Sequence, residues 1–233
     1  MFRRRTGVSV PLPPAELRPG GPLLLDDEEY RRFASATVGQ LLKYVSVTED
    51  SRLLDLGCGP GRLLIGLLQE QVAFGSYVGI DVHGSAIAWA DEALAAGRAN
   101  VRFSRVDAPN DRYNANGTQP VHIPLEDASC DVITLVSVFS HMRLDDVREH
   151  LHEIARVISP DGSVFLTAFV ELHVPTEEEN PAGYLEDWKG PLHCVRFDRH
   201  AFERLAADAG LLVRSFGYRE HRGIQSIYVL QRG

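Results

Sequence analysis

The stretch "LDLGCGPGR", residues 54–62, decides the fold of this chain. A short apolar strand at residues 52–56 runs into a glycine-rich loop, and an apolar helix at residues 61–71 follows. The loop contains three glycines: Gly57, Gly59 and Gly61. Glycines at a strand-to-helix turn allow a sharp bend and let a ligand lie against bare backbone. They would equally suit a plain tight turn, so the loop by itself is a weak functional signal.

An acidic residue at the end of the next strand strengthens that signal. The loop spacing is G-x-G-x-G, and Arg62 stands where the last glycine of the dinucleotide fingerprint G-x-G-x-x-G would fall. Asp81 ends the next strand, close to the roughly 20-residue spacing at which a carboxylate accepts hydrogen bonds from ribose hydroxyls. Asp81 could instead cap the helix that follows it. The loop, the strand and the acid in this order favour a nucleoside ligand.

Strands and helices alternate outward from this loop. Further strands are predicted at residues 77–82, 101–106, 131–138, 163–170, 211–218 and 224–230. Further helices are predicted from the N-cap Asp26 and at residues 85–97, 144–158 and 198–210, the last capped by Asp198. The pattern predicts an α/β fold: a doubly wound, seven-stranded, mostly parallel sheet with a C-terminal antiparallel hairpin and helices on both faces. Ligands bind such sheets at the carboxyl ends of the strands.

Length and composition predict one domain. The chain has 233 residues, of which 44% are hydrophobic, so it can bury a sizeable core. We expect an extended arm at residues 1–25, which are rich in proline and glycine, and a single domain at residues 26–233. Residues 171–193 read as an irregular, acidic and aromatic insertion that could act as a lid.

Charge and cysteine usage restrict the partners. A net charge of −8 disfavours nucleic acids and anionic membranes. No apolar run approaches the roughly 18 residues that a membrane span needs. The three cysteines form no C-x-x-C pair, which suggests neither a disulfide framework nor a zinc site. We therefore expect a cytoplasmic protein whose partner is neither a nucleic acid nor a membrane. We also expect a monomer or homodimer.

Several motifs together resemble the class I S-adenosylmethionine-dependent methyltransferases. They are "LLDLGCGPG", "VGIDV", Asp107 after the third strand and "EIARVISPDGSVFLTAF" at residues 153–169. The resemblance runs from about Asp26 to the C-terminus and implies S-adenosyl-L-methionine as cofactor, with S-adenosyl-L-homocysteine as product. It places Asp55, Gly57, Gly59 and Gly61 at the methionine end, Asp81 at the ribose and Asp107 at the adenine, with Val82, Ala108 and Ser137 beside them. Carboxylates at the strand ends also suit a sulfonium cation.

The end of the fourth strand, "SVFSHM", supplies the candidate catalytic residue. Methyl transfer requires a nucleophile aligned with the methyl group, and an oxygen nucleophile must also lose its proton. In the resembling fold this strand end lies next to the methyl group, so His141 is the candidate general base and an acceptor contact. His141 could instead cap the helix near Leu144. The Asn/Asp-Pro-Pro-aromatic motif of nucleobase enzymes does not occur here.

Nearby polar residues have simpler readings. Asp145 and Asp146 could hold magnesium, but acids in a first helical turn complement the helix dipole, so no metal site is predicted. His150 and His152 are two positions apart on a helix and are expected on the surface.

Two further segments are candidates for contacting the acceptor. The stretch "VDAPNDRYNANGTQP", residues 106–120, offers Asn110, Tyr113 and Asn114, while its Asn-Gly at residues 116–117 predicts a turn. The insertion offers Glu171 and Trp188. Aromatic and polar groups together suit a sugar or another polar metabolite, and we expect methylation at oxygen. The alternatives are a non-catalytic methyltransferase-like binding domain and, disfavoured by Arg62, a nicotinamide-dependent oxidoreductase.

Overall fold

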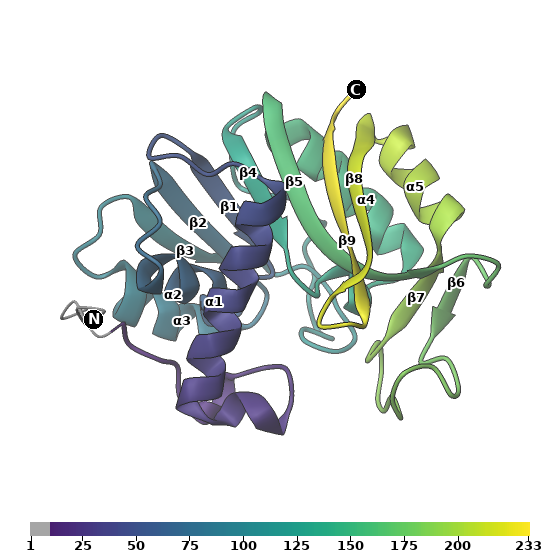
Figure 1. The fold of residues 1–233 in the computed structure, drawn as a ribbon, viewed down its shortest axis with the longest axis horizontal. Helices are drawn as coiled ribbons and strands as arrows, with labels where there is room; N and C mark the ends of the chain where they lie inside the picture. The colour runs from purple at the N-terminus through teal and green to yellow at the C-terminus, as the bar shows by residue number, and fades with distance from the viewer. Residues whose placement is uncertain (1–9) are drawn as a thin grey trace, which may run out of the picture.

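The structure is a computed structural model that describes residues 10–233. Its centre is a seven-stranded sheet in the order β3-β2-β1-β4-β5-β9-β8 (Figure 1). The strands are β1 (Arg52–Leu56), β2 (Ser76–Asp81), β3 (Val101–Arg105), β4 (Cys130–Leu135), β5 (Ile158–Glu171), β8 (Leu211–His221) and β9 (Gln225–Arg232). Strands β1 to β5 are parallel, and β9 runs antiparallel to β5 and β8. The predicted fold class is confirmed.

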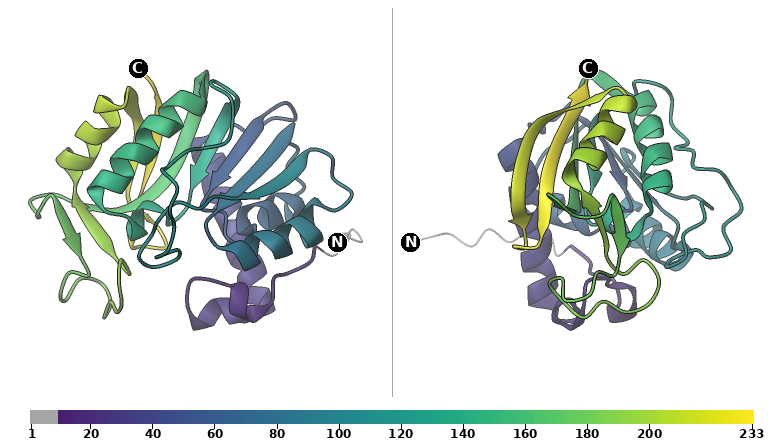
Figure 2. Two further views of the ribbon diagram at one scale, coloured as in Figure 1. Left: turned by 180° about the vertical axis from the view of Figure 1, so that it is seen from behind. Right: turned by 90° about the vertical axis from the view of Figure 1, so that its right-hand side faces the viewer.

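Within the described residues, five α-helices cover the two faces of the sheet (Figures 1 and 2). They are α1 (Asp27–Tyr44), α2 (Arg62–Gln69), α3 (Gly84–Ala90), α4 (Leu144–Val157) and α5 (Arg199–Asp208). Successive strand residues point to opposite faces. Leu53 and Phe165 accordingly pack in the core with α1, α2 and α3, whereas their neighbours Leu54 and Leu166 pack with α4 and α5.

The predicted helix starts are confirmed by their caps. Asp26 Oδ1 accepts hydrogen bonds from the backbone N–H groups of Glu28 at 2.9 Å and Glu29 at 3.0 Å. Asp198 caps α5 by accepting from Ala201 N at 3.0 Å. Such bonds satisfy backbone donors that a helix start otherwise leaves free. They fix where α1 and α5 begin, and so how they lie on the sheet.

The described part of the N-terminal arm, residues 10–25, lies against the domain. It contains two short 3₁₀ turns, Ala15–Leu17 and Pro22–Leu25, and buries Leu24. Arg18 ties the arm to α1 because its guanidinium donates to Leu25 O at 2.9 Å and pairs with Asp27 at 2.7 Å. The remainder of the predicted arm, residues 1–9, lies outside the described residues.

The segment expected to be irregular contains a strand. β6 (Glu177–Glu179) pairs antiparallel with β7 (Val195–Asp198), and β7 pairs parallel with residues 169–171 at the end of β5. Three consecutive glutamates look like a solvated loop in the sequence. They form a strand here because β7 supplies the pairing partner and Arg196 and Arg143 neutralise the carboxylates. In Figure 1 this small sheet projects beside β8 and β9.

Candidate active site

A cavity of about 370 Å³ lies at the carboxyl ends of β1, β2 and β4. Its wall includes Gly57 and Cys58 after β1, Asp81 and Val82 at the end of β2, and Ser137 and Val138 after β4. The strand order reverses between β1 and β4, and this switch point is where such sheets bind ligands. Residues 16–20 of the arm close another side of the cavity.

The glycine loop has the geometry that its sequence predicts. Gly57 has a φ of 73°, in the left-handed region, and a Cβ at this position would lie 2.4 Å from Val138 Cγ2. Only glycine avoids both the strain and the clash. The N–H groups of Gly57 and Cys58 both donate to Ile80 O, at 2.7 and 3.1 Å, which holds the loop against the end of β2.

Asp81 lies at the edge of this loop, as its position in the sequence predicts. Its Oδ2 accepts from Gly59 N at 2.7 Å and its Oδ1 from His83 N at 2.8 Å. Burial raises the pKa of this carboxyl above its ordinary value. A carboxylate has about four acceptor positions, so Asp81 retains capacity for hydroxyl donors in the cavity.

Asp55 lies beneath the loop and does not line the cavity. Its side chain is buried and accepts hydrogen bonds from Tyr77 Oη at 2.7 Å and Thr134 Oγ1 at 2.8 Å. Burial raises its pKa to about 6, although both hydrogen bonds oppose this shift. Asp55 therefore connects β1 to β2 and β4 under the loop. Gly59 and Gly61 also fall outside the wall, where they shape the turn.

Asp107 and Asn114 close the base of the polar loop that follows β3. Asp107 Oδ1 accepts from Asn114 Nδ2 at 3.1 Å and from Arg105 Nη2 at 2.9 Å, and its backbone oxygen accepts from Thr118 N. The hydrogen bond from Asn114, followed by those from Thr118, lowers the pKa of Asp107. Neither Asp107 nor Asn114 lines the cavity, because each side chain is bonded within the loop, but Ala108 does.

The structure brings three predicted acceptor residues together: Asn110, Tyr113 and His141 line the cavity. Asn110 Nδ2 donates to His141 O at 2.9 Å, and Asn110 Oδ1 accepts from Tyr113 N at 3.0 Å. The Tyr113 and His141 rings meet edge to face with centroids 5.5 Å apart. The loop after β3 and the segment after β4 thus form one wall.

His141 is held in a defined tautomer. Its Nδ1 lies 2.9 Å from Leu192 O, and a carbonyl can only accept, so Nδ1 carries the hydrogen and Nε2 is the acceptor. Burial lowers the pKa of His141 to about 4, which keeps the ring neutral at physiological pH.

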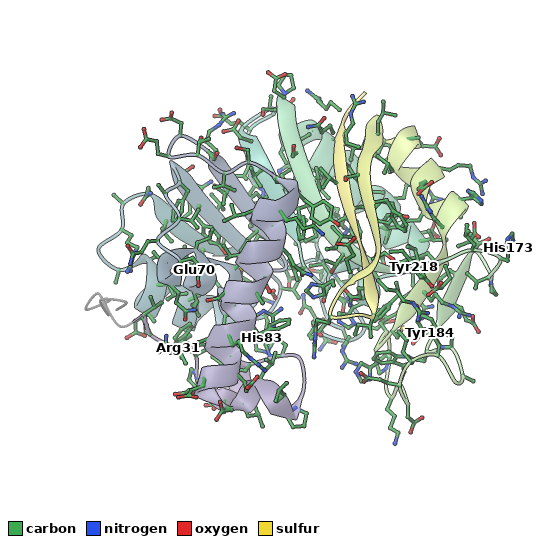
Figure 3. The ribbon with its side chains drawn as sticks, viewed as in Figure 1. Arg31, Glu70, His83, His173, Tyr184 and Tyr218 are labelled. Atoms are coloured by element: carbon green, nitrogen blue, oxygen red, sulfur yellow. The ribbon has the colours of Figure 1, made fainter. Side chains whose placement is uncertain are left out.

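Glu171 and Trp188 lie away from the cavity wall. Glu171 accepts from Tyr218 Oη at 2.7 Å and Arg219 Nη2 at 2.6 Å, and Trp188 packs on Phe169 with ring centroids 5.6 Å apart. Figure 3 shows Tyr184 and Tyr218 on the β6–β7 side of the molecule, opposite His83, which lines the cavity. These residues hold the small sheet together.

Arg62 is a cavity residue whose role the sequence did not reveal. It entered the sequence argument only as the absence of a glycine, yet its guanidinium lies in the wall, 4.8 Å from the Phe33 ring centroid. Arg222, from the turn between β8 and β9, lies 5.0 Å from the same ring. Burial lowers the pKa of Arg62, so this site favours an anionic partner. The sequence feature that could have indicated this role is an arginine at the start of the helix that follows the glycine loop.

The surface prediction for His150 is wrong. Its side chain is 8% exposed and lines the cavity, with Nδ1 2.7 Å from Asp146 O. The prediction considered its spacing from His152, whereas its spacing of three from the buried Val147 places it on the inner face of α4. Among residues 10–233, no group of three or more potential metal ligands occurs.

The fold agrees with comparisons to known proteins. Residues 27–215 match a family described as a methyltransferase domain. The chain therefore belongs to this family of S-adenosylmethionine-dependent methyltransferases, and the predicted class of enzyme and its cofactor are confirmed at that level.

Individual relatives are distant. The chain is similar to the demethylmenaquinone methyltransferase of Lactobacillus johnsonii, with 28% identity over 127 residues, 54% of this chain and 46% of that protein. It is also similar to YcgJ, an uncharacterized methyltransferase of Bacillus subtilis, with 28% identity over 171 residues, 71% of this chain and 56% of that protein. The chain thus spans about half the length of these curated relatives.

Solved structures support the same fold. PH0226 protein from Pyrococcus horikoshii has a TM-score of 0.61 at 16% identity, covering 89% of this chain and 93% of that one. Geranyl diphosphate C-methyltransferase from Streptomyces coelicolor has a TM-score of 0.64 at 12% identity, covering 89% of this chain and 85% of that one.

No helix within residues 10–233 combines the length and apolarity that crossing a membrane requires.

Proposed function

We propose that this protein transfers the methyl group of S-adenosylmethionine to an oxygen of a small or medium-sized polar metabolite, such as a sugar. The observation that carries the proposal is the neutral His141 ring in the cavity wall, with Nδ1–H engaged by Leu192 and Nε2 as the acceptor. An attacking hydroxyl must lose a proton, and a neutral histidine can accept it.

The cavity residues fit the cofactor at both polar ends. When bound, S-adenosylmethionine supplies an electrophilic methyl group on its sulfonium. Asp81 would accept hydrogen bonds from the ribose hydroxyls, and Arg62 would pair with the carboxylate of the methionine end. Val82 and Ala108 would lie beside the base. A cavity of about 370 Å³ falls within the usual range for ligand pockets.

The acceptor would lie against Asn110, Tyr113, Ser137 and His141. Ser137 has a φ of 61° and is held by Thr167 Oγ1, which accepts from Ser137 N at 2.8 Å. A non-glycine residue in this conformation persists only where its surroundings determine it, and such residues concentrate at functional sites. A histidine with a pKa near 4 gives a weak driving force for proton transfer, so an acidic or well-oriented hydroxyl suits it best.

The insertion at residues 171–193 would limit water access to the acceptor. Leu192 belongs to this segment and contacts His141 directly. We propose that the segment acts as a cover over the acceptor end of the cavity. In the same proposal the partner is a free small molecule, and neither a nucleic acid nor a membrane takes part. The enzyme is a monomer or homodimer in the cytoplasm.

Methylation at carbon is the second candidate. The cavity wall also carries apolar side chains, Val136, Val138 and Met142, which suit a flat apolar ring. The demethylmenaquinone methyltransferase of Lactobacillus johnsonii is among the relatives. A carbon nucleophile does not need a hydroxyl proton removed before attack, so the two candidates differ in their dependence on His141.

A methyl-transfer screen with labelled cofactor separates these candidates. Saccharides, phenols, carboxylates, amines and quinols would be tested, and the labelled atom of each product located by mass spectrometry. A labelled methyl group on an oxygen of the acceptor supports the proposal, and a labelled methyl group on carbon or nitrogen overturns it. Calorimetry with S-adenosylhomocysteine and NAD(H) adds a check. Binding of S-adenosylhomocysteine without any methylated acceptor would favour a non-catalytic binding domain, and binding of NAD(H) instead would favour an oxidoreductase.

The role of His141 has a separate test. We expect His141→Ala to lower kcat about 100-fold or more, the range of general base catalysis, with little change in S-adenosylhomocysteine affinity. His152→Ala is the matched control, because His152 is exposed on the same segment of chain. Unchanged turnover on the true acceptor would remove His141 from the mechanism.

A further inference from the structure

Leu192 is the residue that orients the His141 ring. Its carbonyl accepts from His141 Nδ1 at 2.9 Å, its side chain is buried in the main core, and its φ is 47°. That φ lies in the left-handed region, which a branched aliphatic residue adopts only under external constraint. The buried side chain supplies part of this constraint, and contacts to the Leu192 backbone supply the rest.

Glu179 supplies such a contact. Its Oε1 accepts from Leu192 N at 2.8 Å, and its Oε2 pairs with Arg143 at 2.9 Å. Glu179 is the last residue of β6, where pairing with Val195 of β7 fixes its backbone. The carboxylate thus has a rigid base on one side and a charged partner on the other.

The next residue, Asn180, closes the loop in which Leu192 lies. Asn180 Nδ2 donates to Gly190 O at 2.8 Å, and Asn180 Oδ1 accepts from Cys194 N at 2.9 Å. These bonds hold the residues on either side of Leu192. Within this frame, Glu179 provides the hydrogen bond to the Leu192 N–H itself.

We infer that Glu179 is a positioning residue for His141: through the backbone of Leu192 it holds the imidazole in the tautomer with hydrogen on Nδ1 and the acceptor lone pair on Nε2. The logic is that of a base oriented by a third group, here acting through the N–H and the carbonyl of one backbone residue, Leu192. The effect on catalysis rests on the proposed role of His141, whereas the effect on the tautomer does not.

The inference is tested by nitrogen-15 NMR of histidine-labelled full-length protein. Long-range proton–nitrogen spectra distinguish the two tautomers, and His141→Gln identifies the His141 signals by their loss. Wild-type protein should show hydrogen on Nδ1. Glu179→Ala should shift His141 toward the other tautomer or a mixture, while Glu179→Gln, which keeps a side-chain oxygen to accept from Leu192 N, should restore the wild-type pattern.

Glu178→Ala is the matched control. Glu178 lies on the same strand but pairs with Arg196, so its removal should leave the His141 tautomer unchanged. Glu179→Asp keeps the charge for Arg143 but shortens the reach to Leu192, and it gives a second disrupting variant if Glu179→Ala does not fold. Persistence of the wild-type tautomer in a folded Glu179→Ala or Glu179→Asp protein would overturn the inference.

Turnover provides the second readout. We expect Glu179→Ala to lower kcat about 10- to 100-fold, as misplacement of a catalytic group does, with the KM for the cofactor unchanged. If His141→Gln retains full turnover, the proposed function of His141 fails, but the NMR result still decides the role of Glu179. The two failures are therefore distinguishable.

Discussion

The backbone N–H of Gly59 donates a hydrogen bond to Asp81 Oδ2 at 2.7 Å, and this bond joins the glycine loop after β1 to the end of β2. The two residues lie 22 positions apart in sequence, and the bond fixes the loop relative to the Asp81 carboxylate. The carboxylate proposed to hold the ribose therefore also shapes the loop proposed to lie along the methionine end.

Asp81→Ala should weaken S-adenosylhomocysteine binding about 10- to 100-fold. Hydrogen bonds to a charged group contribute about 1.5–3 kcal/mol, and about 1.4 kcal/mol corresponds to a factor of ten. Isothermal titration calorimetry measures the change directly. Asp81→Asn keeps one side-chain oxygen as an acceptor and should lose less affinity. Wild-type affinity in both variants would show that Asp81 does not contact the ligand.

Arg62→Met should weaken S-adenosylhomocysteine binding about tenfold by removing the partner of its carboxylate. Methylthioadenosine lacks the amino acid end, so its affinity should not change. Arg32→Met is the control, because Arg32 is exposed and pairs with Glu29 outside the cavity. Equal losses for both ligands in calorimetry would contradict a carboxylate contact and indicate a general disturbance of the cavity.

Asn110→Ala should raise the KM for the acceptor more than that for the cofactor. The substitution removes the hydrogen bond to His141 O and the acceptor for the N–H groups of Arg112 and Tyr113. Asn116→Ala, in the exposed turn of the same loop, should leave both constants unchanged. Steady-state kinetics with each substrate varied checks this, and identical behaviour of the two variants would return the loop to a surface role.

Gly66→Ala should destabilise the fold by about 1–3 kcal/mol, the usual effect of overpacking. A Cβ at Gly66 would lie 2.5 Å from Ala34 O, where α1 crosses α2. Gly39→Ala should instead stabilise by about 0.5–1 kcal/mol, because Gly39 lies in α1 with no atom within 4 Å of the added Cβ. Urea unfolding measures both, and effects of equal sign would contradict the packing.

Stability should fall on acidification from about pH 6.5, the ordinary histidine pKa. Burial lowers the pKa of His141 to about 4 and of His221 to about 3, so the unfolded chain binds these protons at a higher pH than the folded one. Asp55, with its pKa raised to about 6, opposes this trend. Urea unfolding between pH 7 and 5 should show a shallower slope in His221→Gln, and an unchanged slope would exclude His221 as a contributor.

The positions of Gly57 and Asp81 in the cavity wall could be predicted from sequence because their signals are local. Gly57 follows its strand directly, and Asp81 ends the next one, so each position follows from a short pattern. Their placement in one wall then follows from the parallel sheet.

The acceptor half depends on pairings distant in sequence. Nothing in the sequence around Leu192 indicates that its carbonyl contacts His141. The three glutamates of β6 do not have the pattern of a strand, and they form one because they pair with β7. Asp107 was predicted beside adenine, but its side chain is taken up by Asn114 and Thr118. Such competition between neighbours for one carboxylate cannot be read from spacing.

Strand β5 belongs to two sheets. Its middle pairs with β4 and β9, and its last three residues, 169–171, pair with β7. The segment that reaches His141 is thus joined to the tip of β5 and to the start of α5, and Leu192 and the Arg143–Glu179 ion pair also hold it against the domain. On the proposed role of this segment as a cover, exchange of its exposed residues should alter which acceptor is admitted, provided that Leu192 and Glu179 are kept. In this proposal the acceptor preference and the contacts to the cofactor are carried by two different parts of the chain.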